Sequence, residues 1–130
     1  MEYNILLKKA QEASQNAYAP YSDFQVGACV LAKSGKTYSG CNMENASYGL
    51  TVCAERNALA NAIVNGEREI VAIAIWATKM DNCLPCGACR QVIFEFQKEN
   101  GLDVITQDKN DDNGYVLHKI DGLLPEGFKL

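Results

Sequence analysis

The chain has 130 residues, enough for one domain with a hydrophobic core and too few for two, so we expect residues 1–130 to form a single domain. The net charge is −4, and lysines and arginines form no basic stripe. Binding to a nucleic-acid backbone is therefore disfavoured, because phosphate contacts need clustered cations. A small-molecule substrate fits this composition better.

The chain shows no targeting or membrane-spanning pattern. Residues Met1–Asn4 lack the basic and apolar segments of a secretory signal, and the longest apolar run, Ile70–Ala77, is too short to cross a bilayer. Six cysteines in such a chain indicate metal binding or catalysis before disulfides. We therefore expect a cytoplasmic protein.

The first half of the chain predicts a helix, a hairpin and a second helix. Ile5, Leu6, Ala10 and Ala13 repeat at helical spacing, and Pro20 follows, which pushes the residue before it out of the helical region. The next apolar segment alternates as a strand does. The predicted elements are a helix over 2–17, strands over 24–32 and 37–42 joined by a turn at 33–36, a loop over 44–51 and a helix over 53–64.

The second half predicts two helix–strand units and a short tail. Residues 70–77 are continuously apolar, as in a buried strand. The further predicted elements are a loop over 79–84, a helix over 86–98, a strand over 102–106, a polar turn over 107–114, a weak strand over 115–118 and a short helix over 120–124. This order predicts an α/β fold with a mixed sheet of about five strands flanked by helices.

Three cysteines and one glutamate are the centre of this interpretation. Cys86 and Cys89, three residues apart at a helix start, place both thiols on one side, and Cys53 at the start of another helix supplies a third. Helix N-termini favour thiolates. Glu55 can reach a bound water without ligating. Because catalytic zinc sites use three protein ligands and leave one position to water, the pattern predicts an open site for one Zn²⁺ per chain.

Cys83 competes with Cys53 for the role of third ligand, because Cys83, Cys86 and Cys89 follow one another at three-residue intervals. If all four thiols bound, the site would be closed and structural. A lone Cys-x-x-Cys pair also occurs in redox proteins. We favour Cys53, since a glutamate at the position of Glu55 has no purpose in a closed site.

The remaining cysteines and the only histidine are interpreted as structural. Cys29 and Cys41 fall in strand patterns and are expected to be small buried residues. His118 lies in the weak strand and is expected to be a surface or hydrogen-bonded residue, not a ligand.

Three thiolates on one Zn²⁺ would leave the cluster with a charge of about −1, which weakens the ability of the ion to ionise water. Arg56, next to Glu55, is the first candidate to offset this charge by hydrogen bonding to a cysteine sulfur. Arg90, next to Cys89, is the second candidate.

Several motifs spread along the chain carry a resemblance to a known family. Cys-Ala-Glu followed by Pro-Cys-x-x-Cys is the three-cysteine form of the zinc deaminase signature, and the wider sequence resembles the small cytidine deaminases. The matching segments are Ala19–Ser22, Phe24–Ala28, Gly40–Ala46, Cys53–Arg56, Pro85–Gln91 and Leu123–Pro125. They extend from the end of the first helix to the tail.

The resemblance implies a three-layer α/β/α sandwich in which Cys53, Cys86 and Cys89 bind zinc. It implies that Glu55 takes a proton from the activated water and delivers it to N3 of the base and then to the leaving ammonia. In chemical terms, zinc makes hydroxide available near neutral pH and the hydroxide attacks C4 of the cytosine ring.

The same resemblance assigns the substrate contacts. It implies that Asn42 and Glu44 hold the ribose hydroxyls and that Phe24 packs against the base. The backbone at Ala54 and Pro85 is expected to contact the base edge and its amino group.

The short members of this family are homotetramers whose active sites borrow residues from a neighbouring subunit. Tyr48 and Phe128 match the borrowed positions, although Phe128 could instead cover the core of its own chain. The chain departs from the pattern at 107–114, which is longer and more acidic than expected, and at Glu126–Gly127, which affects the placement of Phe128.

We therefore predict a zinc-dependent hydrolase of pyrimidine salvage that deaminates cytidine and 2′-deoxycytidine to the uridine nucleosides. One rival is the same chemistry on blasticidin S or on a base within nucleic acid; the acidic composition disfavours the polymer, and the pair Asn42 and Glu44 favours a free ribose. Two further rivals are a zinc-stabilised binding module without catalysis and a thiol redox protein. Neither gives Glu55 a role.

Overall fold

A five-stranded sheet forms the centre of the computed structural model, which describes residues 1–130. The strand order is β2-β1-β3-β4-β5; the β3–β4 pair is parallel and the other three pairs are antiparallel. The mixed sheet predicted from the sequence is thus confirmed. The strands are β1 (Val26–Ala32), β2 (Thr37–Cys41), β3 (Ile70–Ala77), β4 (Asp103–Gln107) and β5 (Tyr115–Lys119).

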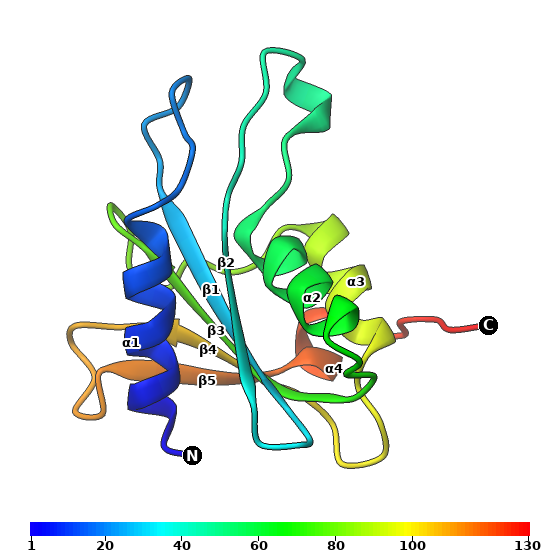
Figure 1. Ribbon diagram of the computed structural model, residues 1–130. Helices are drawn as coiled ribbons and strands as arrows, with labels where there is room; N and C mark the ends of the chain where they lie inside the picture. Colours follow the sequence, from blue (N-terminus) through cyan, green and yellow to red (C-terminus); the bar gives the residue numbers. More distant parts are fainter.

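Helices cover both faces of this sheet (Figure 1). The helix α1 packs on one face, while α2, α3 and α4 lie on the other, and each face has its own cluster of buried apolar side chains. This is the predicted α/β/α sandwich. The helices are α1 (Tyr3–Ser14), α2 (Ala54–Val64), α3 (Gly87–Glu95) and α4 (Ile120–Leu123), with a short 3₁₀ helix η1 (Tyr48–Leu50).

The two helix layers explain the burial of β1. Its sequence predicts an alternating strand, yet all seven of its residues are buried, because side chains on both faces meet helices. Close contact between α1 and β1 further buries this strand. A Cβ atom on Gly27 would lie 1.9 Å from the carbonyl oxygen of Ala10, so α1 rests directly on the backbone of β1.

The helix α1 differs from its prediction in extent and in its buried face. It ends at Ser14, not at residue 17, because the following chain pairs elsewhere: the Tyr18 N–H donates to the Asn42 carbonyl at 3.0 Å. Leu6 and Ala10 are buried as the periodicity predicts, but Ile5 is 48% exposed. The buried face of α1 is therefore rotated by part of a turn from the face that the apolar periodicity predicted.

The loop predicted over residues 44–51 contains η1 and projects from the body of the molecule, at the top of Figure 1. Both ends of this loop are fixed, since Met43 and Val52 exchange two backbone hydrogen bonds of 2.9 and 3.0 Å. The C-terminal residues extend away from α4 on the side of α3. None of the helices has the length and apolar character needed to span a membrane.

Candidate metal centre and active site

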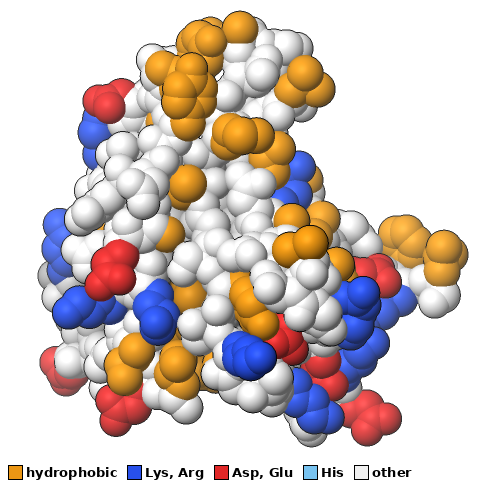
Figure 2. Space-filling model, viewed as in Figure 1, with side chains coloured by type: hydrophobic (Ala, Val, Ile, Leu, Met, Phe, Trp, Pro, Cys, Tyr) orange, Lys and Arg blue, Asp and Glu red, His pale blue; other side chains and the backbone are white.

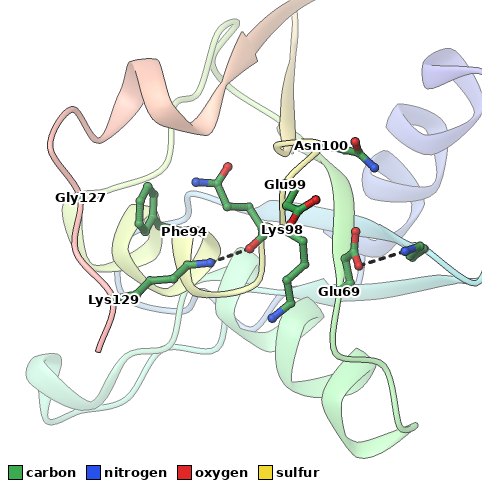
Figure 3. A pocket seen from close by; sticks show the side chains of 9 residues that line it. Glu69, Phe94, Lys98, Glu99, Asn100, Gly127 and Lys129 are labelled. Carbon is green, nitrogen blue, oxygen red and sulfur yellow. Dashed lines mark hydrogen bonds and ion pairs between the residues drawn. The ribbon is translucent and has the colours of Figure 1, made fainter.

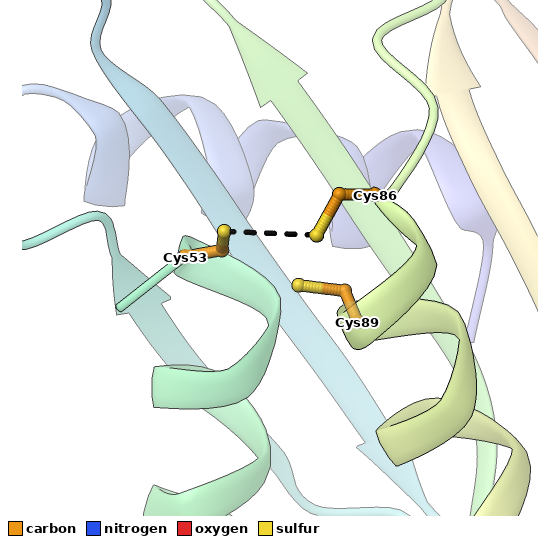
Figure 4. Close-up of side chains that lie close together, drawn as sticks. All are labelled: Cys53, Cys86 and Cys89. Atoms are coloured by element: carbon orange, nitrogen blue, oxygen red, sulfur yellow. Dashed lines mark hydrogen bonds between the residues drawn. The ribbon is translucent and has the colours of Figure 1, made fainter. Parts of the chain in front are cut away.

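The three cysteines named from the sequence come together at two adjacent helix starts (Figure 4). Cys53 is the residue that precedes α2, Cys86 precedes α3, and Cys89 lies in the first turn of α3. Their sulfur atoms all lie within 4.8 Å of one another, and those of Cys53 and Cys86 are 4.0 Å apart. Sulfurs bound tetrahedrally to one zinc ion are about 3.8 Å apart, given a Zn–S distance of about 2.3 Å. The donor set and its spacing therefore fit Zn²⁺.

The helix α2 is held in place by direct contact with β2. A Cβ atom on Gly40 would lie 2.3 Å from the Ala58 backbone nitrogen, so only glycine allows this approach. The Asn57 side chain donates to the Cys41 carbonyl at 2.8 Å, and that of Asn61 donates to the Ser39 carbonyl at 3.1 Å. These contacts fix the helix start that presents Cys53.

The sulfurs share protons in a way that favours a bound cation. A hydrogen bond from the Cys89 thiol and the neighbouring Arg56 guanidinium together lower the pKa of Cys53 to about 5. The same hydrogen bond raises the pKa of Cys89. Since ligating cysteines must be deprotonated, a divalent ion entering the site would displace the shared proton.

Of the two arginines proposed to offset the thiolate charge, Arg56 is the one that contacts a sulfur. Its Nη2 atom lies 3.5 Å from the Cys53 sulfur, and hydrogen bonds to Cys53 and Cys89 raise the pKa of the guanidinium. Arg90 instead donates to two backbone carbonyls, those of Pro85 and Leu123.

Glu55 lies in the first turn of α2 and is only 5% exposed. Burial raises the pKa of its carboxyl group to about 7, with the charge of Cys53 contributing. A carboxyl group with such a pKa can both accept and return a proton near neutral pH. This is the property that the predicted role of Glu55 requires.

Cys83 is not part of the sulfur cluster. It packs against the core between the sheet and the helices, and burial raises the pKa of its thiol to about 11. The neutral thiol is thus favoured at this position. The geometry therefore groups Cys53, not Cys83, with Cys86 and Cys89.

The other cysteines and the histidine only partly follow the prediction. Cys29 is fully buried, as expected, and burial raises the pKa of its thiol. Cys41 is only half-buried, because it lies on the edge strand β2. His118 is half-buried and does not belong to the cysteine cluster, but its ring atom Nε2 is buried without a hydrogen-bond partner, which the prediction of a surface or hydrogen-bonded residue did not anticipate.

The predicted substrate-binding residues lie on neighbouring loops. The side chain of Asn42 accepts from the Val26 N–H at 2.9 Å and donates to the Phe24 carbonyl at 2.8 Å, so it fixes the start of β1. Phe24 is half-buried against the core. Glu44 accepts from the N–H groups of Tyr21 and Ser22 at 3.0 and 3.2 Å and from the Ser22 hydroxyl.

Glu44 also lines a small cavity of about 260 Å³ together with Tyr21, Ser22, Tyr48 and Thr51. A larger cavity of about 690 Å³ lies between the end of α3 and the C-terminal residues (Figure 3). Apart from Phe94 and Gly127, its lining is polar or charged, and it includes none of the predicted site residues. The smaller cavity is lined by two of them, Glu44 and Tyr48, and is therefore the better candidate of the two for part of the substrate site.

The remaining predicted residues divide into buried and exposed ones. Ala54, which follows Cys53, and Pro85, which precedes Cys86, are both buried. Tyr48 and Phe128 are 74% and 65% exposed, so the single chain gives them no packing role. The ring of Tyr48 packs in a T-shaped arrangement with another exposed aromatic ring, that of Tyr21, at a centroid distance of 5.8 Å.

Two contributors were missed from the sequence. Ser22 fixes the Glu44 carboxylate, and Asn57 fixes the backbone of β2 next to the metal centre. Ser22 stands within one of the matching motifs, but nothing in its spacing indicates its partner. Asn57 lies two residues after Glu55 on the predicted helix, and only its direction toward β2 reveals its contact.

Comparison with known proteins confirms, for most of the chain, the family resemblance that the motifs indicated. The family model described as cytidine and deoxycytidylate deaminase zinc-binding region matches residues 1–101. A cytidine deaminase of Sporosarcina psychrophila is 41% identical over 128 residues, which are 98% of this chain and 92% of that protein. A cytidine deaminase of Halalkalibacterium halodurans is 54% identical over 95 residues, 73% of this chain and 72% of that protein.

Solved structures agree with the sequences. The crystal structure of cytidine deaminase from Burkholderia pseudomallei is 42% identical, with a TM-score of 0.89, and the match covers 98% of this chain and all of the other. That of cytidine deaminase from Mycobacterium tuberculosis is 35% identical, with a TM-score of 0.86, covering 100% of this chain and 99% of the other. The similarity thus includes both helix starts that carry the cysteines.

Proposed function

This chain belongs to the cytidine deaminase family, and we propose that it converts cytidine and 2′-deoxycytidine to uridine and 2′-deoxyuridine in pyrimidine salvage, with release of ammonia. Cytidine deaminase activity is what its close relatives carry in their names. The observation that carries the proposal is the group of three sulfurs within 4.8 Å beside the buried carboxyl group of Glu55.

Cys53, Cys86 and Cys89 would hold one zinc ion, which when bound supplies a Lewis acid that makes hydroxide available near neutral pH. Glu55 would accept the proton released by water and return it to N3 of the base as hydroxide adds to C4. Glu55 would then take the remaining proton from the hydroxyl group added at C4 and deliver it to the amino group. The C4–N bond breaks, ammonia leaves, and the C4 hydroxyl becomes the carbonyl of uridine. A carboxyl pKa of about 7 suits both transfers.

Asn42 and Glu44 would bind the sugar while they hold their own loops. A carboxylate offers about four lone-pair directions, so Glu44 can accept a sugar hydroxyl in addition to its three present donors. Asn42 keeps one amide hydrogen beyond the one it donates to Phe24. Contacts through the 3′-hydroxyl, which both nucleosides have, would accommodate either substrate. Phe24 would pack against the base, and the backbone at Ala54 and Pro85 would contact its polar edge.

We further propose that the protein is a homotetramer with shared active sites, in which Tyr48 and Phe128 of one subunit reach the site of another. Exposed apolar side chains support an interface of this kind: Figure 2 shows them gathered at the top, over the projecting loop. The exposed large apolar residues of this region are Tyr18, Tyr21, Met43, Tyr48 and Leu50.

The whole chain, residues 1–130, would act as one cytidine deaminase domain, because all of its strands join a single sheet. A cytoplasmic location is also part of the proposal. All six cysteines are free, and three of them must remain reduced to bind metal.

The direct test follows the ultraviolet absorbance of cytidine added to purified protein, with and without a chelator strong enough to remove zinc. The proposal expects a loss of absorbance that the chelator abolishes and about one zinc per chain. No loss with cytidine or 2′-deoxycytidine, in protein shown to contain zinc, would contradict it. Blasticidin S would then be the next substrate to test.

A further inference from the structure

Arg90 connects the metal centre to the C-terminal segment. Its Nε atom donates to the Pro85 carbonyl at 2.8 Å, and its Nη1 atom donates to the Leu123 carbonyl at 2.9 Å. Its backbone N–H donates to the Cys86 carbonyl at 2.9 Å. The guanidinium group therefore links the carbonyl groups of Pro85 and Leu123, while the bond to Cys86 belongs to the backbone of α3.

These contacts are well suited to fixing a backbone. Pro85 is buried and has no N–H group, so its carbonyl must find a partner within the protein. The guanidinium group is a planar fork that holds two acceptors in a fixed relation, which a lysine cannot do. A carbonyl oxygen has two lone pairs, so the Pro85 carbonyl can accept a second hydrogen bond while Arg90 holds it.

Further contacts hold the C-terminal segment against α3 and against the residues just after its end. The Gln91 side chain donates to the Phe128 carbonyl at 3.3 Å, and the Lys129 ammonium donates to the Gln97 carbonyl at 2.6 Å (Figure 3). Between them, a Cβ atom on Gly127 would lie 2.9 Å from the ring of Phe94. Residues 127–129 are thus attached to α3, whose first turn carries Cys89, and to the residues that follow this helix.

We propose that Arg90 is a positioning residue for the deamination step, which holds the Pro85 carbonyl against the amino group of the substrate and couples it to the C-terminal segment. This inference rests on the proposed function. As the amino group is protonated and leaves, its positive charge strengthens a hydrogen bond to a carbonyl oxygen. Misplacing the Pro85 carbonyl should therefore reduce kcat more than it raises KM.

The alternative role for Arg90, compensation of the thiolate charge, predicts a different result for a lysine at this position. Lysine keeps the positive charge but cannot bridge the carbonyls of Pro85 and Leu123. Arg90→Lys and Arg90→Gln should therefore behave alike if position matters, whereas Arg90→Lys should retain activity if charge matters.

The experiment measures kcat and KM for cytidine, zinc content, and amide hydrogen exchange over residues 120–128 in wild-type protein, Arg90→Lys and Arg90→Gln. Arg68→Gln is the matched control, because Arg68 also donates to two carbonyls, those of Ile63 and Glu67, far from the cysteines in the fold. In both Arg90 variants we expect kcat per bound zinc to fall about tenfold to a hundredfold, as misplaced catalytic groups do. Exchange over 120–128 should become faster, with Arg68→Gln unchanged.

An Arg90→Gln protein with the wild-type kcat, or an Arg90→Lys protein that restores it fully, would overturn the inference. So would the failure of both Arg90 variants to fold or to bind zinc, since Arg90 would then have a purely structural role. Wild-type protein that does not deaminate cytidine would remove the proposed function itself, so the two failures are distinguishable.

Discussion

The guanidinium group of Arg56 contacts the sulfur of Cys53, with 3.5 Å between Nη2 and Sγ. The two residues are three positions apart, so α2 itself brings the cation to the thiolate at its N-terminus. The Nε atom of Arg56 is buried without a partner, so the guanidinium interacts through its other nitrogens with the sulfur atoms of the cluster. This arrangement gives the sulfur cluster a compensating charge that does not occupy a coordination position.

Replacing Arg56 by alanine should weaken zinc binding and activity together. The loss should be about tenfold to a hundredfold, as for other groups that hydrogen-bond to metal ligands. Zinc content after dialysis against a weak chelator, and kcat per bound zinc, measure the two effects. Arg68→Ala serves as the control for removing a positive charge from this chain. Unchanged zinc retention and activity in Arg56→Ala would remove Arg56 from the site.

Replacing Glu55 by glutamine should separate zinc binding from proton transfer. The amide has nearly the shape of the carboxyl group but cannot carry the proton, so kcat should fall by about 10²–10⁴ while one zinc per chain remains. Burial and fold should be preserved, which circular dichroism and thermal unfolding can check. Glu99→Gln, at an exposed position, should have no effect. A Glu55→Gln protein with the wild-type kcat would contradict the role of Glu55 in proton transfer.

Gly40 should be essential for the position of α2 and hence of Cys53. A methyl group there would meet the Ala58 nitrogen at 2.3 Å, and a backbone atom cannot give way as a flexible side chain can. We expect Gly40→Ala to lower the free energy of unfolding by about 2–4 kcal/mol and to weaken zinc binding. Gly122→Ala, where a Cβ atom meets nothing within 4 Å, is the matched control. Equal stability of the two variants, measured by denaturant unfolding, would contradict the packing argument.

The free energy of unfolding should fall at alkaline pH as the Tyr3 hydroxyl loses its proton. Burial, and a 2.5 Å hydrogen bond to Asp103, raise the pKa of its hydroxyl from 10.0 to about 12. Because the folded pKa lies above the unfolded one, the stabilisation is fully present below pH 10 and is lost as the pH rises toward 12.

The Tyr3→Phe variant tests this directly. Below pH 10 it should be less stable than wild type by about 1–2 kcal/mol, a value reduced for the partial exposure of the pair. The difference should shrink between pH 10 and 12, as measured by urea unfolding across that range. A difference that stays constant would show that the hydroxyl does not titrate as described.

Much of the fold could be predicted because short stretches of sequence determine its helices and strands. Residues 70–77 read as a buried strand and form β3 without correction, and the cysteine spacings placed Cys86 and Cys89 on one helix start. The choice between Cys53 and Cys83 could not be settled from spacing, because it depends on how α2 and α3 lie against each other on one face of the sheet. The end of α1 could not be predicted from local sequence either, since a contact with a distant loop determines it.

Shared active sites predict that two inactive variants can restore each other. If Phe128 of one subunit completes the site that contains Glu55 of another, Phe128→Ala and Glu55→Gln disable different subunits of the same site. Mixed tetramers then contain some sites in which Glu55 and the neighbouring Phe128 are both intact. With random mixing of equal amounts, about a quarter of the sites should be restored.

The two variants should be refolded together or produced in the same cells, and kcat measured per chain. Each variant mixed with itself is the control, and light scattering reports the number of subunits. Phe128 is exposed in the single chain, so its replacement should not reduce the stability of the subunit by itself. If activity of the mixture equals the average of the separate variants, each active site lies within one chain. Phe128 would then act, if at all, only on the site of its own subunit.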